Sequence, residues 1–274
     1  MIEDKLNIAV LGDLHGHLDL ALSILKKYES VTNTKLDAIL QVGDLGYFPD
    51  LSRLDDATAK FAKKDPIELG FQDFLNETEV SKRHFEGQET KIDADLVFIA
   101  GNHEDQEKLR KLESSAKKAP IPVDFFGKIL YLPSGEVYEI KKGNLRLRFS
   151  CLGRISGDIK EYNFSHSDLK KVKNLDDIDV FLTHEPDSEE IREVLKRLQP
   201  KYHFCGHLHI GRKLDLANNT ESYSLDQVGF RKSHKLNDKC IGILSIEKDK
   251  RQFKFLEEQW LKEFKKGLSY QKAN

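Results

Sequence analysis

The sequence predicts an α/β (α+β) protein built as a mixed β-sandwich, in which two sheets pack face to face and helices flank them. Two observations support this fold class. In the first hundred residues, apolar runs of strand length are separated by helical patterns, which favours parallel strands joined by helices. After residue 128, short apolar runs follow one another with Gly or Pro between them, which favours a mixed or largely antiparallel second sheet.

The first sheet is expected from buried strands that are each followed directly by a glycine. Their residues are 7–11, 38–42 and 95–100. Leu18, Leu22 and Leu25 recur at helical spacing after the first of them, so a helix returns across the sheet. In parallel sheets, ligands gather at the carboxyl ends of the strands, which is where the polar residues of these segments stand.

The second sheet is expected from a longer series of short strands. Their residues are 129–132, 137–140, 145–151, 179–183, 202–205, 222–225 and 241–246. A helix over about 188–198 separates two of them and is stopped by Pro200. No internal repeat, low-complexity tract or linker divides the chain, so we expect a single domain over residues 1–274.

A helical insertion at about 48–92 is expected between the second and third strands. Leu51, Leu54 and Phe61 suggest one helix, and Asp65-Pro66-Ile67-Glu68 supplies a cap and a first-turn proline for another. The insertion is either an ordinary elaboration of the crossover or a lid that shapes the substrate site.

The chain is expected to finish with a helix at about 254–266. Its apolar residues fall on one helical face and are Phe255, Leu256, Trp260, Leu261 and Phe264. This face either docks onto the body of the protein or binds a partner.

The composition is that of a globular chain, since 39% of the 274 residues are hydrophobic and 33% are charged. The formal net charge of −2 gives no general attraction to nucleic acid or to anionic membranes. The 3 cysteines have no CxxC spacing, which fits a reducing compartment better than a disulfide framework. The first residues are too acidic for a signal peptide, and no apolar run is long enough to span a bilayer. We therefore expect a cytoplasmic protein with no membrane partner.

Five short segments place Asp, Asn and His side chains directly after strand-like runs. They are Gly12-Asp13-Leu14-His15-Gly16, Gly43-Asp44, Gly101-Asn102-His103-Glu104, Thr183-His184-Glu185 and Gly206-His207-Leu208-His209. Residues two apart leave an extended backbone on the same side, so Asp13 with His15, and His207 with His209, can chelate an ion. A lone Asp-x-His is weak evidence for a metal site. All five of these segments, in this order, strongly indicate a site for two divalent ions. Their oxygen and nitrogen ligands suit Mn²⁺, Fe²⁺ or Zn²⁺.

These segments, in this order, resemble the calcineurin-like metallophosphoesterase superfamily. The resemblance extends from Ile8 to about Ile210. It implies a four-layer fold, in which a β-sandwich is flanked by helices, and a centre of two metal ions.

The resemblance also implies a role for each polar side chain. One ion would be held by Asp13, His15 and His209. The other would be held by Asn102, His184 and His207. Asp44 would bridge both ions.

The same resemblance implies a hydrolase of phosphate esters. Two dications would clamp the phosphoryl oxygens and acidify a bridging water, and the resulting hydroxide would attack phosphorus. His103 corresponds to the family's histidine that binds no metal and lies over the leaving group, so it would act as the general acid.

A narrower similarity points to the branch that resembles RNA lariat debranching enzymes. It rests on residues 101–104, 153–157, 202–209 and 224–226. One departure is Asp13, because the debranching enzymes typically carry a cysteine at this position. The residues after Asp44 lack the Asp-Arg-Gly expected of protein serine/threonine phosphatases, which argues against that branch. Arg154 is either a phosphate contact in the substrate site or a surface arginine.

Phosphodiester hydrolysis is therefore the favoured function, with a nucleotide or a nucleic acid as a candidate substrate. Three alternatives stay open. The chain could be a phosphomonoesterase, or a catalytically silent member of the fold that serves as a protein scaffold, although no ligand has been lost. It could also bind nucleic acid without hydrolysis, but the near-neutral charge argues against that.

Overall fold

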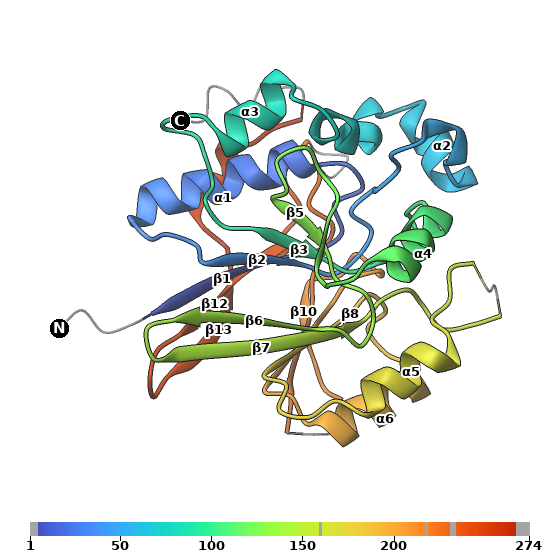
Figure 1. Ribbon diagram of the computed structural model, residues 1–274. Helices are drawn as coiled ribbons and strands as arrows, with labels where there is room; N and C mark the ends of the chain where they lie inside the picture. The colour runs from blue at the N-terminus through green and yellow to red at the C-terminus, as the bar shows by residue number, and fades with distance from the viewer. Residues whose placement is uncertain (1–4, 159–160, 217–218, 231–233, 267–274) are drawn as a thin grey trace.

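Two β-sheets lie face to face between two layers of helices in the computed structural model (Figure 1). The structure describes residues 5–158, 161–216, 219–230 and 234–266. The four layers confirm the predicted fold class.

The first sheet has a parallel centre and antiparallel edges. Its strands, in spatial order, are β13 (Arg251–Phe255), β12 (Ile241–Ile246), β1 (Leu6–Leu11), β2 (Ala38–Gln41), β3 (Leu96–Phe98), β5 (Ile129–Tyr131) and β4 (Ile121–Pro122). β1, β2, β3 and β5 run parallel, while β12, β13 and β4 are antiparallel to their neighbours. All six residues of β1 are buried because both faces of the sheet are covered.

The second sheet repeats this plan. Its strands, in spatial order, are β10 (Arg212–Leu214), β11 (Glu221–Ser224), β9 (Tyr202–Cys205), β8 (Val180–Thr183), β7 (Leu145–Leu152) and β6 (Val137–Lys142). β7, β8, β9 and β11 are parallel, and the two edge strands are antiparallel. In each sheet the carboxyl ends of the parallel strands therefore lie together, at the same end of the strands.

Helices cover the outer face of each sheet (Figure 1). They are α1 (Leu18–Thr32), α2 (Asp56–Ala62), α3 (Glu79–Phe85), α4 (Gln106–Ser115), α5 (His166–Lys173) and α6 (Glu189–Leu198). α1 lies along the first sheet, whereas α5 and α6 pack against the second. Between the sheets lies a separate apolar core, in which the ring of Phe204 in β9 contacts that of Phe253 in β13 at 4.7 Å between centroids.

The expected helical insertion forms two α-helices and two 3₁₀ helices. After the 3₁₀ turn Leu51–Arg53 comes α2, followed by the 3₁₀ helix Pro66–Phe74 and α3. Asp65 caps the longer 3₁₀ helix through its side chain, as the Asp-Pro pattern predicts. Phe71 and Phe74 of that helix are buried in the core under α1, so the insertion is packed onto the body.

The expected C-terminal helix over 254–266 is wrong. Its first residues belong to β13, which pairs with β12, and only the 3₁₀ helix Gln259–Glu263 follows. Strand pairing with β12 outweighs the local helical pattern, because tertiary contacts override weak propensities. Phe264 is nevertheless buried against the core under α1, so the segment docks onto the body.

Two strands that the sequence places in the second sheet belong to the first. β5 lies beside β3, and β12 lies beside β1. The local sequence pattern predicts that a segment is a strand, but packing between distant segments decides which strand it pairs with. The second sheet is mixed, as expected.

The three cysteines are buried, and none is joined to another by a disulfide. Among the described residues, no helix combines the length and apolarity needed to cross a bilayer.

We predict that Phe204→Ala lowers the free energy of unfolding by about 3–5 kcal/mol, the usual cost of removing a buried aromatic ring. Phe204 has 0% exposure and connects the two sheets. Phe61→Ala is the matched control because that ring is 52% exposed, and its effect should stay within about 0.5 kcal/mol. Denaturant unfolding measures both. Equal losses in the two variants would contradict the role of Phe204 in joining the sheets.

Candidate metal centre

The candidate ligands lie in loops that follow the carboxyl ends of five strands, β1, β2, β3, β8 and β9. These strands come from both sheets, so the site lies at the edge where the two parallel sets end. The structure brings together all seven predicted side chains: Asp13, His15, Asp44, Asn102, His184, His207 and His209.

Asp13, His15 and His209 form the first group. Their ligand atoms all lie within 4.8 Å of one another. His209 Nε2 is 2.9 Å from Asp13 Oδ2 and 3.3 Å from His15 Nε2. Three groups with available lone pairs thus converge on one point, which is the requirement for holding a cation.

Asp44, His184 and His207 form the second group, again within 4.8 Å. His184 Nε2 lies 3.2 Å from Asp44 Oδ2 and 3.0 Å from Asn102 Oδ1. Asn102 therefore joins this group, as the sequence predicts. The His184 Nδ1–H donates to the Val42 carbonyl at 2.9 Å, which turns the Nε2 lone pair toward the group.

Asp44 connects the two groups. Its Oδ2 lies 3.7 Å from His15 Nε2 and 3.2 Å from His184 Nε2. Its Oδ1 accepts the backbone N–H of His103 at 2.7 Å. A carboxylate in this place is suited to bridging two cations.

Four of the candidate ligands have a left-handed backbone. They are His15, Asp44, His207 and His209, with φ between 41° and 68°. Non-glycine residues rarely adopt this conformation, which costs on the order of 1–3 kcal/mol each and is concentrated at functional sites. The surrounding fold therefore holds these side chains in place against a local preference.

The protonation of the histidines is set by burial and by the two aspartates. Burial lowers the pKa of His15 to about 4, although Asp44 and Asp13 act in the opposite direction, and burial also lowers the pKa of His207. Burial acts in the same direction on His184, but Asp44 outweighs it and raises the pKa to about 10. A cation would compete with that proton, so binding would release it.

The residues fit a pair of divalent cations. Asp13 and Asp44 are buried carboxylates, and buried charge is tolerated only when it is paired. Four imidazoles, one amide and two carboxylates supply nitrogen and oxygen donors without a thiolate, which suits Mn²⁺, Fe²⁺ or Zn²⁺.

Glu104 ties the loops of the site together. It is buried, and its two oxygens accept the backbone N–H groups of Leu45 at 2.7 Å and Gly101 at 2.8 Å. Burial, together with Asp44, raises the pKa of Glu104 to about 8. Glu104 therefore fixes the loops after β2 and β3 relative to each other.

His103 is held by a residue that the sequence did not reveal. Its Nδ1 lies 3.1 Å from Asp55 Oδ2, and its ring lies 5.4 Å from that of His15. Asp55 also caps α2 by accepting the N–H groups of Ala57 and Thr58. The sequence pattern could identify the cap, but the contact with His103 depends on how the insertion folds back over the site.

The two interpretations of Arg154 from the sequence are both wrong. Its side chain has 0% exposure, so it is not a surface arginine and cannot contact a phosphate from solvent. Arg154 donates to Gln106 Oε1 at 3.0 Å and to Glu113 Oε1 at 2.8 Å. Gln106 donates in turn to the Gly101 carbonyl at 2.8 Å. Arg154 thus belongs to a buried network that reaches the loop bearing His103.

Comparisons with known proteins agree with this geometry. A curated relative, the lariat debranching enzyme of Arabidopsis thaliana, is 25% identical over 308 aligned residues, which cover 93% of this chain and 67% of that protein. A dimetal phosphatase from Danio rerio has a similar solved structure, with a TM-score of 0.51 at 13% identity, covering 91% of this chain and 95% of that chain. Another solved structure has a TM-score of 0.53 at 14% identity, covering 91% of this chain and 98% of that chain. At these identities the solved structures show the fold alone.

The family model described as calcineurin-like phosphoesterase matches residues 6–211, which include all five segments of the site. The match extends over more than half of the chain, and it accounts for the two groups of candidate ligands at the strand ends. The chain therefore belongs to the calcineurin-like phosphoesterase family and is a metal-dependent hydrolase of phosphoester bonds.

Proposed function

We propose that the protein is a phosphodiesterase with two divalent metal ions, acting in the cytoplasm on a substrate that contains a nucleotide. The observation that carries this proposal is the convergence of two ligand groups on Asp44, with His103 beside them. The similarity to a lariat debranching enzyme favours a diester over a monoester. The complete ligand set argues against a silent scaffold.

The proposed site residues divide the work. When bound, two divalent cations would supply positive charge to the phosphoryl oxygens and acidify the attacking water. Asp13, His15 and His209 would hold one ion, Asn102, His184 and His207 would hold the other, and Asp44 would touch both.

His103 would protonate the leaving oxygen. Its side chain is 26% exposed, so the ring can reach a substrate, and the Nδ1 contact with Asp55 directs Nε2 away from that carboxylate. General acid catalysis of this kind contributes about 10²–10⁴-fold.

The proposed function is tested by metal content and by a substrate panel. Protein purified without chelator should contain about two divalent ions per chain, by elemental analysis or after titration with Mn²⁺. With Mn²⁺ it should hydrolyse nitrophenyl diesters, 2′,3′-cyclic nucleotides or branched RNA faster than nitrophenyl monoesters. A preference for monoesters would favour the phosphomonoesterase alternative, and a metal-loaded protein inactive on every substrate would favour the scaffold.

Replacing Asp44 tests the bridge. Asp44→Asn removes a charge that both ions would share, so we expect metal retention to weaken and turnover to fall by about 100-fold, the upper end of the loss seen when groups that support a metal site are replaced. Elemental analysis and steady-state kinetics measure the two effects. Asp50→Asn is the control, because that carboxylate is exposed and contacts only Ser52 among the described residues. Normal turnover with both metals retained would refute the bridging role.

Replacing His103 separates proton donation from metal binding. His103→Ala should keep both metals and lose about 10²–10⁴-fold on substrates with basic, alkoxide-type leaving groups. The loss should be smaller on nitrophenyl esters, whose leaving group scarcely needs a proton. His166→Ala, at an exposed histidine, should change neither rate. Equal losses on both substrate classes would indicate phosphate binding instead of acid catalysis.

Replacing Asp55 tests how His103 stays protonated. Burial alone would lower the pKa of His103, but Asp55 and Asp44 outweigh it and raise the pKa to about 9. Asp55→Asn removes one of these charges, so the pKa of His103 should fall. Because the acid works only when protonated, the basic limb of kcat/KM against pH should move to lower pH. Asn still caps a helix well, so α2 should remain folded. A basic limb at the same pH in variant and parent would show that Asp55 does not act through His103.

A further inference from the structure

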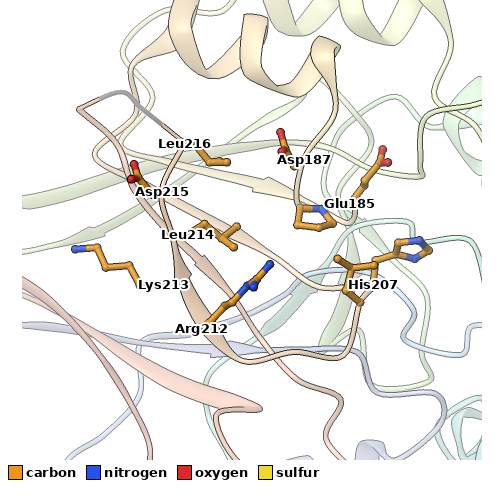
Figure 2. Close-up of a pocket in the computed structure, with 10 residues that line it drawn as sticks. Glu185, Asp187, His207, Arg212, Lys213, Leu214, Asp215 and Leu216 are labelled. Carbon is orange, nitrogen blue, oxygen red and sulfur yellow. The ribbon is translucent and has the colours of Figure 1, made fainter.

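A pocket of about 540 Å³ opens directly beside the candidate metal centre (Figure 2). Its walls are the loop after β8 (Glu185 to Asp187), the segment from His207 to Leu208, and β10 with the residues that follow it, to Leu216. His207 belongs to both the pocket and the second ligand group. The volume lies within the range of about 300–1,000 Å³ typical of sites for small ligands.

Part of the lining is apolar and faces solvent. The apolar lining residues are Pro186, Leu208, Leu214 and Leu216, of which Pro186 is buried, Leu214 and Leu216 are partly exposed and Leu208 is exposed. Leu208 stands between two candidate metal ligands and is 51% exposed. An exposed apolar surface at the mouth of a polar site is typical of a place where part of a ligand binds.

The guanidinium of Arg212 lines this pocket and is available to contact a ligand. The guanidinium points into the pocket (Figure 2), and it has no ion pair or hydrogen bond within the described part of the chain. The carboxylates of Glu185 and Asp187 on the opposite wall have partners other than Arg212, and each carboxylate keeps lone pairs for further hydrogen bonds. Glu185 accepts from the backbone and side chain of Ser156, and Asp187 forms a two-point pair with Arg192.

The alternation of β10 separates Arg212 from its neighbour. Arg212 and Leu214 are two apart on β10, and the side chain of Lys213 between them extends in another direction from that of Arg212 (Figure 2), although Lys213 also contributes to the lining. Lys213 instead lies over the ring of Tyr223, at 5.5 Å, and 3.5 Å from Glu221 Oε2. Two adjacent cations on one strand thus have different surroundings.

We propose that this pocket binds a nucleobase of the substrate, a deduction that rests on the proposed phosphodiesterase function. A guanidinium plane stacks on a flat ring, and leucine side chains can cover the opposite face of that ring. Glu185 and Asp187 can accept hydrogen bonds from ring N–H or amino groups. The same two carboxylates would repel a second phosphate, so a base fits this wall better than an anion.

The pocket and His103 lie against different ligand groups. His103 is next to His15 of the first group, whereas the pocket contains His207 of the second. A diester has two ester groups, so the leaving group would face His103 while the other group places its base in the pocket. The pocket would then select the part of the substrate that stays on the phosphate.

The test compares two Mn²⁺-dependent substrates with one leaving group, thymidine 5′-(p-nitrophenyl phosphate) and methyl p-nitrophenyl phosphate. The measured quantity is the ratio of kcat/KM for the thymidine ester to kcat/KM for the methyl ester. Arg212→Ala should lower this ratio about tenfold, the scale of losing one base-stacking contact. Leu214→Ala should also lower it. Lys201→Ala also removes one positive charge, but from a 52% exposed side chain outside the pocket lining, and should leave the ratio at the wild-type value.

Three outcomes would overturn the pocket assignment. If Arg212→Ala leaves kcat/KM unchanged for both substrates, Arg212 has no role in binding either of them. If kcat/KM falls by the same factor for both, the ratio is unchanged and Arg212 contacts the phosphate instead of the base. An equal fall of the ratio in Lys201→Ala would show that the effect comes from the overall charge of the protein and not from the pocket. Failure of the wild type on both diesters would instead contradict the proposed function. In that case the pocket is tested by calorimetry, in separate titrations of the protein with thymidine 5′-monophosphate and with inorganic phosphate. Arg212→Ala should weaken the affinity for the nucleotide only. Equal weakening for both ligands, or no weakening, would contradict the pocket assignment.

Discussion

The Asp44 carboxylate is the group on which the rest of the site depends. It is buried where the two sheets meet, and an unpaired charge there would be strongly destabilising. Its backbone carbonyl accepts the N–H groups of Leu14 and His15, at 2.9 and 2.8 Å. Its side chain accepts the His103 N–H and lies close to His184. One residue therefore connects the loops after β1, β2, β3 and β8, and its charge creates the need for compensating cations.

The loops around Asp44 leave no space for larger residues. A side-chain carbon at Gly101 would collide with Asp44 Oδ1, and one at Gly206 would collide with Asp13 Oδ1. These two glycines let the backbone approach the carboxylates closely, which is why the segments read Gly-Asn-His and Gly-His-x-His. The left-handed backbone of four candidate ligands and the two glycines have the same effect. Both bring the oxygen and nitrogen atoms of residues from separate strands close together.

The ligand set could be predicted from the sequence because it follows a local rule. Each ligand comes just after a buried strand, and parallel strands bring such positions to a common edge. Asp55 could not be predicted in this way. Its N-cap pattern is shared with Asp65, which caps the next helix of the insertion, and only the fold of the insertion decides that Asp55 reaches His103. The burial of Arg154 and the placement of β5 and β12 in the first sheet likewise depend on packing between distant segments.

The insertion gains a chemical role from these contacts. Besides Asp55, it contributes Glu68, whose Oε2 lies 3.9 Å from His15 Nδ1. Burial and the neighbouring Asp65 raise the pKa of Glu68 to about 7. The insertion therefore supplies acidic groups around His15 and His103, while β10 supplies an arginine and leucines on the side of His207. If the two metal ions bind as proposed, a substrate phosphate would lie between surfaces of different character. That asymmetry suits a diester, whose two ester groups differ, better than a monoester, whose single ester group would be the leaving group that faces His103.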